Sequence, residues 1–184
     1  MNTCLIVVDL QNDYFPGGTM ELLGIKEAAA NAQLLLGEWR KAKLPVIHVQ
    51  HIAAQPGATF FLAETGGARI NKMVTPLEDE KVVVKNFPNS FRGTTLLEIL
   101  KNIKTENLLI CGAMSHMCID ATTRAAFDLG FNCTVAEDAC ATKDLIFKGR
   151  TIRASDVHAS FMAALSAPYA KVLATQEIIK SMAE

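Results

Sequence analysis

Three hydrophobic runs of the chain each end beside a residue that could take part in covalent catalysis. The run at 5–8 is followed by Asp9, the run at 82–84 by Lys85, and the run at 108–111 by a short turn that leads to Cys118. A thiolate is a strong nucleophile, a carboxylate can accept the thiol proton, and an ammonium group stabilises negative charge. Ligands of open α/β sheets bind beyond the carboxyl ends of the strands, so we expect these three side chains in one pocket.

The position of Cys118 at the start of an expected helix favours acyl transfer. Unpaired backbone N–H groups and the positive end of the helix dipole favour a thiolate there, and Lys85 would act in the same direction. Asp9 would raise the pKa of the thiol, but it supplies a base that takes the proton as attack begins. The backbone N–H groups of Met114 and Cys118 are candidates for an oxyanion hole. Together these groups form an acid–base relay.

The elements that must position these residues alternate along the chain. Apolar, β-branched runs predict buried parallel strands, and Ala- and Leu-rich stretches between them predict helices. Right-handed crossovers between such strands give an α/β fold with a three-layer α/β/α sandwich around a six-stranded parallel sheet, in one domain over residues 1–184. The expected strands lie near 4–8, 46–49, 82–85, 108–111, 131–135 and 170–173, and the expected helices near 25–41, 94–103, 117–129, 155–165 and from 175.

Composition excludes several classes of partner. The 184 residues carry a formal net charge of −1 with both signs mixed, which gives no electrostatic footprint for nucleic acid or an anionic membrane. We find no 18-residue apolar span and no leader pattern, and five cysteines, an odd number, favour free thiols. We therefore expect a cytoplasmic protein that acts on a small molecule, with no disulfides and no cofactor.

Several longer motifs surround the three candidate residues. They read VVDLQNDYF around Asp9, KNFPNSFRGTTL from Lys85 and CGAMSHMCIDATTRAAFDLGF around Cys118, followed by SDVHASFMAAL and ATQEII. With these motifs, over nearly its whole length, the chain resembles the isochorismatase-like cysteine hydrolases, which include nicotinamidases, N-carbamoylsarcosine amidohydrolases and streptothricin hydrolases. The resemblance implies that Cys118 is the nucleophile, Asp9 the general base, and Lys85 the cation that pairs with Asp9.

The same resemblance implies further properties. It implies a cis peptide bond between Ala113 and Met114, a six-stranded parallel sheet flanked by helices, and a homodimer or larger homo-oligomer. Family members that cleave the vinyl ether of isochorismate lack the cysteine nucleophile, so Cys118 favours hydrolysis of a small amide, lactam or ureido C–N bond through a thioester. Vinyl-ether hydrolysis, a thiol redox sensor and a catalytically silent scaffold are the alternatives.

Two histidines follow the expected second strand, where the related nicotinamidases carry a metal site built from one Asp and two His. The Asp of that pattern is absent here. His48 and His51 are three positions apart on an extended segment, so they should point to opposite faces. We therefore expect no metal, and a structural or pocket role for either histidine.

The substrate pocket is expected to be apolar and aromatic. The long stretch at 51–80 is rich in Pro and Gly and is the expected functional loop. His116 is a candidate pocket residue, or a base for Cys118, although two residues apart on a tight turn the two side chains should diverge. The remaining candidates are phenylalanines, for which core packing is the alternative: Phe15, Phe60, Phe61 and Phe87.

Overall fold

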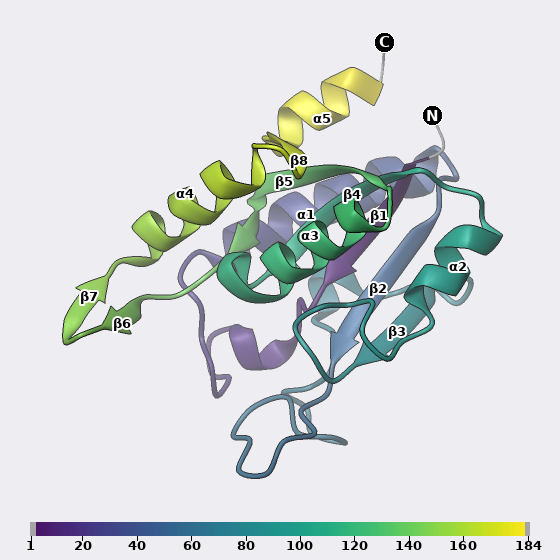
Figure 1. Ribbon diagram of the computed structural model, residues 1–184. Coiled ribbons are helices and arrows are strands. Elements are labelled where there is room, and N and C mark those ends of the chain that lie inside the picture. Colours follow the sequence, from purple (N-terminus) through teal and green to yellow (C-terminus); the bar gives the residue numbers. More distant parts are fainter. Residues whose placement is uncertain (1–2, 183–184) are drawn as a thin grey trace.

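Six parallel strands form the central sheet of the protein (Figure 1). The computed structural model describes residues 3–182. The order of the strands across the sheet is β3-β2-β1-β4-β5-β8, which confirms the expected fold class. Their bounds are Thr3–Val8 for β1, Val46–His51 for β2, Lys81–Lys85 for β3, Asn107–Ala113 for β4, Asn132–Ala141 for β5 and Ala170–Leu173 for β8.

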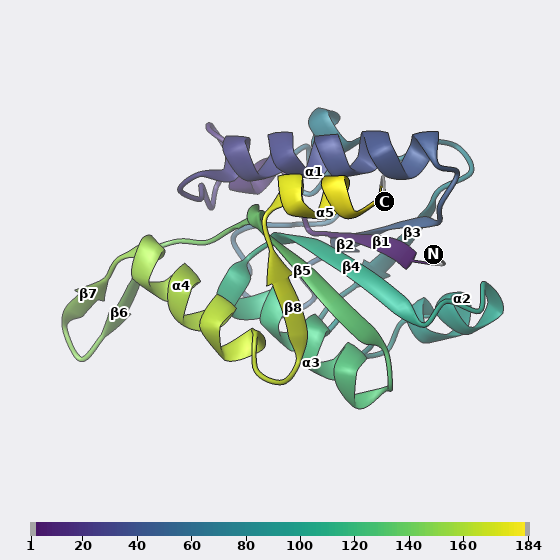
Figure 2. The ribbon, with the colours of Figure 1, turned by 90° about the horizontal axis from the view of Figure 1, so that it is seen from above.

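Helices cover both faces of this sheet (Figure 2). On one face lie α1 (Ile25–Lys41) and α5 (Thr175–Met182), and on the other lie α2 (Leu96–Asn102), α3 (Asp120–Asp128) and α4 (Ala154–Leu165). The bounds of α1, α4 and β8 agree with those expected from the sequence to within one residue. No helix among residues 3–182 is long and apolar enough to cross a membrane.

The central strand β1 is apolar from Cys4 to Val8 because this part is buried on both faces. Leu5 and Val7 pack in the core beneath α1, whereas Ile6 and Val8 pack in the core beneath α2, α3 and α4. Alternate side chains of a strand point to opposite faces, so a strand covered on both sides needs apolar residues at every position. The same reason explains the unbroken apolar run of β4.

Two features of the fold were not predicted. The expected helix from about 117 starts earlier, with a π-helical turn (η3, Ser115–Ile119) in which the Ile119 N–H donates to the Met114 carbonyl. A short hairpin of β6 (Leu145–Phe147) and β7 (Arg150–Ile152) projects beyond α4 (Figure 1). Its turn residues, Lys148 and Gly149, both have positive φ, as a two-residue hairpin turn requires.

Gly112 allows the two central strands to approach each other directly below the candidate site. Its φ is +128°, and a Cβ there would lie 1.9 Å from the Val8 carbonyl oxygen. We expect Gly112→Ala to lower the free energy of unfolding by about 3 kcal/mol or more, because steric overlap and backbone strain add. Urea unfolding would measure the loss.

Gly130→Ala is the matched control. Gly130 also has a positive φ (+92°), but no other atom would lie within 4 Å of the new Cβ. It therefore reports backbone strain alone, which costs about 1–3 kcal/mol. Equal losses in the two variants would contradict the proposed overlap with Val8.

Candidate active site

The three candidate catalytic residues come from three separate elements at one end of the sheet. Asp9 directly follows β1 and has a positive φ of 51°. Lys85 is the last residue of β3 and lies opposite His51 of β2 in the strand register. Cys118 lies within the π-helical turn that follows β4. Because the strands are parallel, their carboxyl ends bring these side chains to one edge.

The ammonium group of Lys85 contacts three other side chains of the site. Its Nζ lies 2.7 Å from Asp9 Oδ2, 3.1 Å from Cys118 Sγ and 2.9 Å from His51 Nδ1. Asp9, Lys85 and Cys118 are all buried, with exposed fractions of 0%, 1% and 5%. The structure thus brings the three residues expected from the sequence into contact, and it adds His51 to them. The three contacts match the three N–H bonds of an ammonium group.

The surroundings keep the cysteine protonated at rest. Burial raises the pKa of the Cys118 thiol, the negative charge of Asp9 raises it further, and Lys85 lowers it by less than these two effects together. For Lys85, burial lowers the pKa, but Asp9 and Cys118 outweigh burial and raise the pKa above its usual value. The site therefore favours the thiol form of Cys118 and the ammonium form of Lys85.

A cavity of about 480 Å³ opens onto Cys118. Apolar and aromatic side chains make up most of its wall, and the aromatic residues Tyr14, Phe60 and Phe61 pack against one another with ring centroids 4.7–6.3 Å apart. The lining residues are Tyr14, His51, Ala54, Gln55, Phe60, Phe61, Asn86, Phe87, Pro88, Met114, Met117 and Cys118. Among them, Phe60, Phe61 and Phe87 were expected from the sequence.

Two expected pocket residues do not line this cavity, and those predictions are corrected. Phe15 packs in the core on the α1 face, with 7% of its surface exposed. His116 Nδ1 lies 2.6 Å from Thr142 Oγ1, and its ring packs against Phe161. Side chains two positions apart on a helical turn do not face the same way, which is why His116 points away from Cys118.

Two polar residues that sequence reasoning missed hold the cavity wall. Asp13 Oδ2 accepts the Phe61 N–H at 2.6 Å and so fixes the aromatic segment. The Gln11 side chain binds the His51 backbone twice, since Oε1 accepts the His51 N–H at 2.7 Å and Nε2 donates to the His51 carbonyl at 2.8 Å. Both residues belong to the polar stretch that follows Asp9, but their partners lie 40 or more positions away.

The turn between β4 and Cys118 offers a backbone donor to the cavity. The peptide bond between Ala113 and Met114 is cis, and Met114 lines the cavity. Within residues 3–182, the Met114 N–H has no hydrogen-bond partner. A free N–H beside a nucleophile is the group that an oxyanion hole requires.

Ligand-type atoms of Asp9, His51 and Cys118 lie within 4.8 Å of one another, a spacing that a metal ion could bridge. However, Lys85 Nζ contacts all three residues at 2.7–3.1 Å. A divalent ion there would meet an ammonium charge at close range and would have to compete with it for the same donors. The cluster therefore fits the ammonium group and does not fit a metal.

His48 lies apart from this cluster. Its Nε2 is 2.9 Å from Glu80 Oε2, and Glu80 also binds Arg40. His48 and His51 thus point to opposite faces, as their spacing predicted. His48 therefore contacts Glu80 and does not line the cavity at Cys118.

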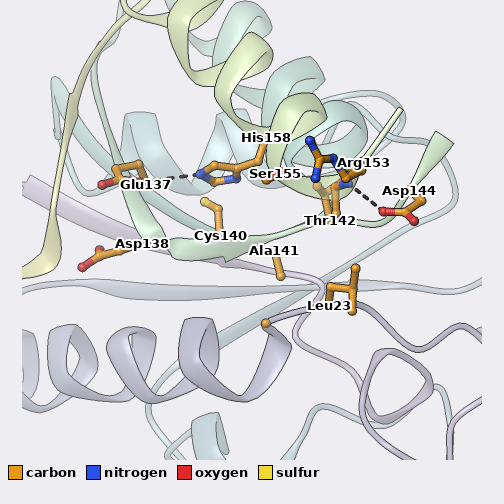
Figure 3. A pocket seen from close by; sticks show the side chains of 12 residues that line it. Leu23, Glu137, Asp138, Cys140, Ala141, Thr142, Asp144, Arg153, Ser155 and His158 are labelled. Atoms are coloured by element: carbon orange, nitrogen blue, oxygen red, sulfur yellow. Dashed lines mark hydrogen bonds and ion pairs between the residues drawn. The ribbon is translucent and has the colours of Figure 1, made fainter. Parts of the chain in front are cut away.

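A second cavity, of about 520 Å³, lies between β5 and the start of α4 (Figure 3). It contains a thiol, Cys140, but burial raises the pKa of that thiol well above its usual value. His158 reaches toward this cavity from α4, and it binds the buried Ser115 hydroxyl at 2.8 Å and lies 3.5 Å from Glu137. The Ser115 hydroxyl has a base in His158, but it is fully buried and does not line this cavity. Among the described residues, the Cys140 thiol has no side-chain hydrogen bond to a base or a cation, so the first cavity is the stronger candidate for the chemistry.

Comparison with known proteins places these observations in a family. The family model described as "Isochorismatase domain" matches residues 3–177. An uncharacterized isochorismatase family protein, YddQ of Bacillus subtilis (strain 168), is 48% identical over 98% of this chain and 100% of its own length. A streptothricin hydrolase of Streptomyces noursei is 34% identical over 77% of this chain and 50% of its own. The crystal structure of a putative isochorismatase hydrolase from Oleispira antarctica has a TM-score of 0.93 and 47% identity, covering 97% of this chain and 96% of that one.

Proposed function

The chain belongs to the isochorismatase family of hydrolases, and we propose that it cleaves the C–N bond of a small, uncharged amide, lactam or ureido compound through a thioester on Cys118. One observation carries the proposal. Lys85 Nζ bridges Asp9 Oδ2 and Cys118 Sγ at 2.7 and 3.1 Å, and the thiol faces a largely apolar cavity. A nucleophile, a base and a fixed cation in contact are the parts that acyl transfer requires.

In the first step, Cys118 Sγ attacks the carbonyl carbon of the substrate while Asp9 takes the thiol proton. Transfer during attack is needed because the pKa of the thiol is raised by burial and by Asp9. The negative charge that forms on the carbonyl oxygen would be stabilised by the free Met114 N–H. The C–N bond then breaks, and the leaving nitrogen takes the proton from Asp9. A thioester remains on Cys118.

In the second step, water attacks the thioester carbonyl and Asp9 accepts a proton from that water. The C–S bond breaks, the acid product leaves, and the proton returns to the sulfur. Lys85 stays an ammonium group throughout and stabilises the negative charge on Asp9 and on the sulfur. The two steps sum to hydrolysis of the C–N bond, so neither step needs an oxidant or a reductant.

The wall of the cavity supports an uncharged substrate. None of the described residues that line it is Asp, Glu, Lys or Arg. The nearest cation, Lys85, is buried and already bound to Asp9, Cys118 and His51. A carboxylate bound in the cavity would therefore lose water without gaining an ion-pair partner, which is costly. Tyr14, Gln55 and Asn86 provide neutral polar groups among the aromatic rings.

A matched pair of ureido compounds tests this selectivity. N-carbamoylglycinamide and N-carbamoylglycine differ only in that the second carries a carboxylate. We expect kcat/KM to be at least about tenfold higher for the uncharged member, because an unpaired carboxylate in the cavity costs more than about 1.4 kcal/mol. Amides, lactams and isochorismate would complete the panel. Preference for the carboxylate would contradict the assignment of an uncharged substrate.

We also propose that the protein works as a homo-oligomer in a reducing compartment such as the cytoplasm. The β6–β7 hairpin supports the first part, because Ile146 and Phe147 at its end are 78% and 64% exposed. Large apolar side chains grouped on a projecting hairpin favour contact with another chain. The second part is supported by the five cysteines, which are all free. Sedimentation analysis tests this contact. Phe147→Asp should sediment as a smaller species than the wild type.

A further inference from the structure

Contacts with the backbone and with the ring fix the position of His51. It is the last residue of β2, and the buried Gln11 amide binds both its N–H and its carbonyl. Its ring centroid lies 5.8 Å from that of Phe61. The backbone and the ring therefore have fixed positions beside Cys118.

The contact with Lys85 decides which ring nitrogen of His51 carries a proton. An ammonium group has only hydrogens to donate, so His51 Nδ1, at 2.9 Å from Lys85 Nζ, must accept. A neutral imidazole with an accepting Nδ1 has its proton on Nε2. Burial lowers the pKa of His51, the Lys85 charge lowers it further, and Asp9 opposes them more weakly. The neutral form is thus favoured.

The second ring nitrogen is neither paired with a described residue nor fully buried. His51 lines the cavity, and its Nε2 has no hydrogen-bond partner among the described residues. Some fully buried side-chain nitrogen and oxygen atoms have no hydrogen-bond partner, but His51 Nε2 is not one of them. A ring nitrogen of His51 lies within 4.8 Å of Cys118 Sγ. A group bonded to the sulfur would therefore lie beside this ring.

We propose that Lys85 locks His51 as the neutral Nε2–H tautomer, and that this N–H binds an acceptor atom of the substrate beside the reacting carbon. The proposal rests on the function proposed above and narrows its substrate class to compounds with an uncharged acceptor at that place. In this role His51 is a specificity-determining residue. Lys85 then has two tasks, since the same ammonium group pairs with Asp9 and orients His51.

Nitrogen-15 NMR of histidine-labelled protein tests the tautomer without any substrate. Long-range proton–nitrogen spectra distinguish the Nε2–H tautomer, the Nδ1–H tautomer and the imidazolium ion. We expect the Nε2–H pattern for His51 at neutral pH, assigned by its loss in His51→Gln. A protonated Nδ1, an imidazolium or an averaged mixture would overturn the proposal.

Two substitutions of His51 test the roles of Nδ1 and Nε2 separately. In His51→Asn the amide oxygen lies near the place of Nδ1, so Lys85 keeps an acceptor but the cavity loses the N–H. In His51→Gln the amide nitrogen reaches the place of Nε2 and restores a donor. We expect kcat/KM for an amide hydrolysed by the wild type to fall about tenfold or more in His51→Asn and to recover largely in His51→Gln, as for one lost hydrogen bond.

The apparent pKa of Cys118, taken from the pH dependence of its alkylation by iodoacetamide, is a readout that loss of substrate binding does not move. It should be unchanged in His51→Asn, because Lys85 remains satisfied. Wild-type kcat/KM in His51→Asn would overturn the proposal, as would equal losses in both variants together with a shifted alkylation profile. If the wild type hydrolyses no compound of the panel, the proposed function fails, and the NMR measurement alone decides the assignment of His51.

Discussion

Replacing Cys118 with alanine is expected to lower kcat by at least about 10⁴-fold, because removing the nucleophile removes the covalent route itself. The acyl adduct that intact-mass measurement detects on the wild type during turnover should disappear. The fold should persist, since Lys85 keeps its contacts with Asp9 and His51 at 2.7 and 2.9 Å. A melting temperature close to that of the wild type would show that lost turnover is not lost folding.

Cys140→Ala is the matched control for this variant. Cys140 is also a buried thiol, with 8% of its surface exposed, but it lines the second cavity. Its replacement should leave turnover and the adduct unchanged. Amide turnover retained in Cys118→Ala would contradict the thioester. Turnover of isochorismate by that variant would instead assign the site to vinyl-ether hydrolysis, and an oxidised but never acylated Cys118 would favour a thiol sensor.

Replacing Asp9 with asparagine should have opposite effects on turnover and on ionisation of the Cys118 thiol. Turnover is expected to fall by about 10²–10⁴-fold, because the general base is lost. Yet the pKa of Cys118 should fall as well. The charge of Asp9 raises that pKa, whereas Lys85, which remains, lowers it. At neutral pH a larger fraction of the variant would therefore be thiolate, and iodoacetamide should alkylate it faster than the wild type.

Asp120→Asn provides the comparison. Asp120 lies two positions after Cys118, where it pairs with Arg124 on α3. It is not among the groups that shift the pKa of Cys118, so both turnover and the pH profile of alkylation should match the wild type. Slower alkylation in Asp9→Asn would contradict the mechanism, because it would mean that Asp9 forms the thiolate before substrate binds.

The sequence by itself determined the sheet and the positions of the three candidate catalytic residues. Runs such as 5–8 and 108–111 are apolar at every position, and only a strand covered on both faces buries such a run completely. Parallel strands end at one edge, so the residues that follow these runs had to converge there. Asp9, Lys85 and Cys118 could thus be placed together before any coordinates were known, and the order of the motifs agreed with a known family.

Only the tertiary structure decided which other side chains share the site. The spacing of His116 and Cys118 did not fix the direction of either side chain, because the π-helical turn sets both. Phe15 and Phe60 are both aromatic residues in loops, but one packs in the core and the other lines the cavity. His51 joins the site through contacts with Gln11 and Lys85, which lie 40 and 34 positions away. Strand periodicity is local and can be found in a sequence, whereas side-chain direction in loops depends on partners that only folding brings near.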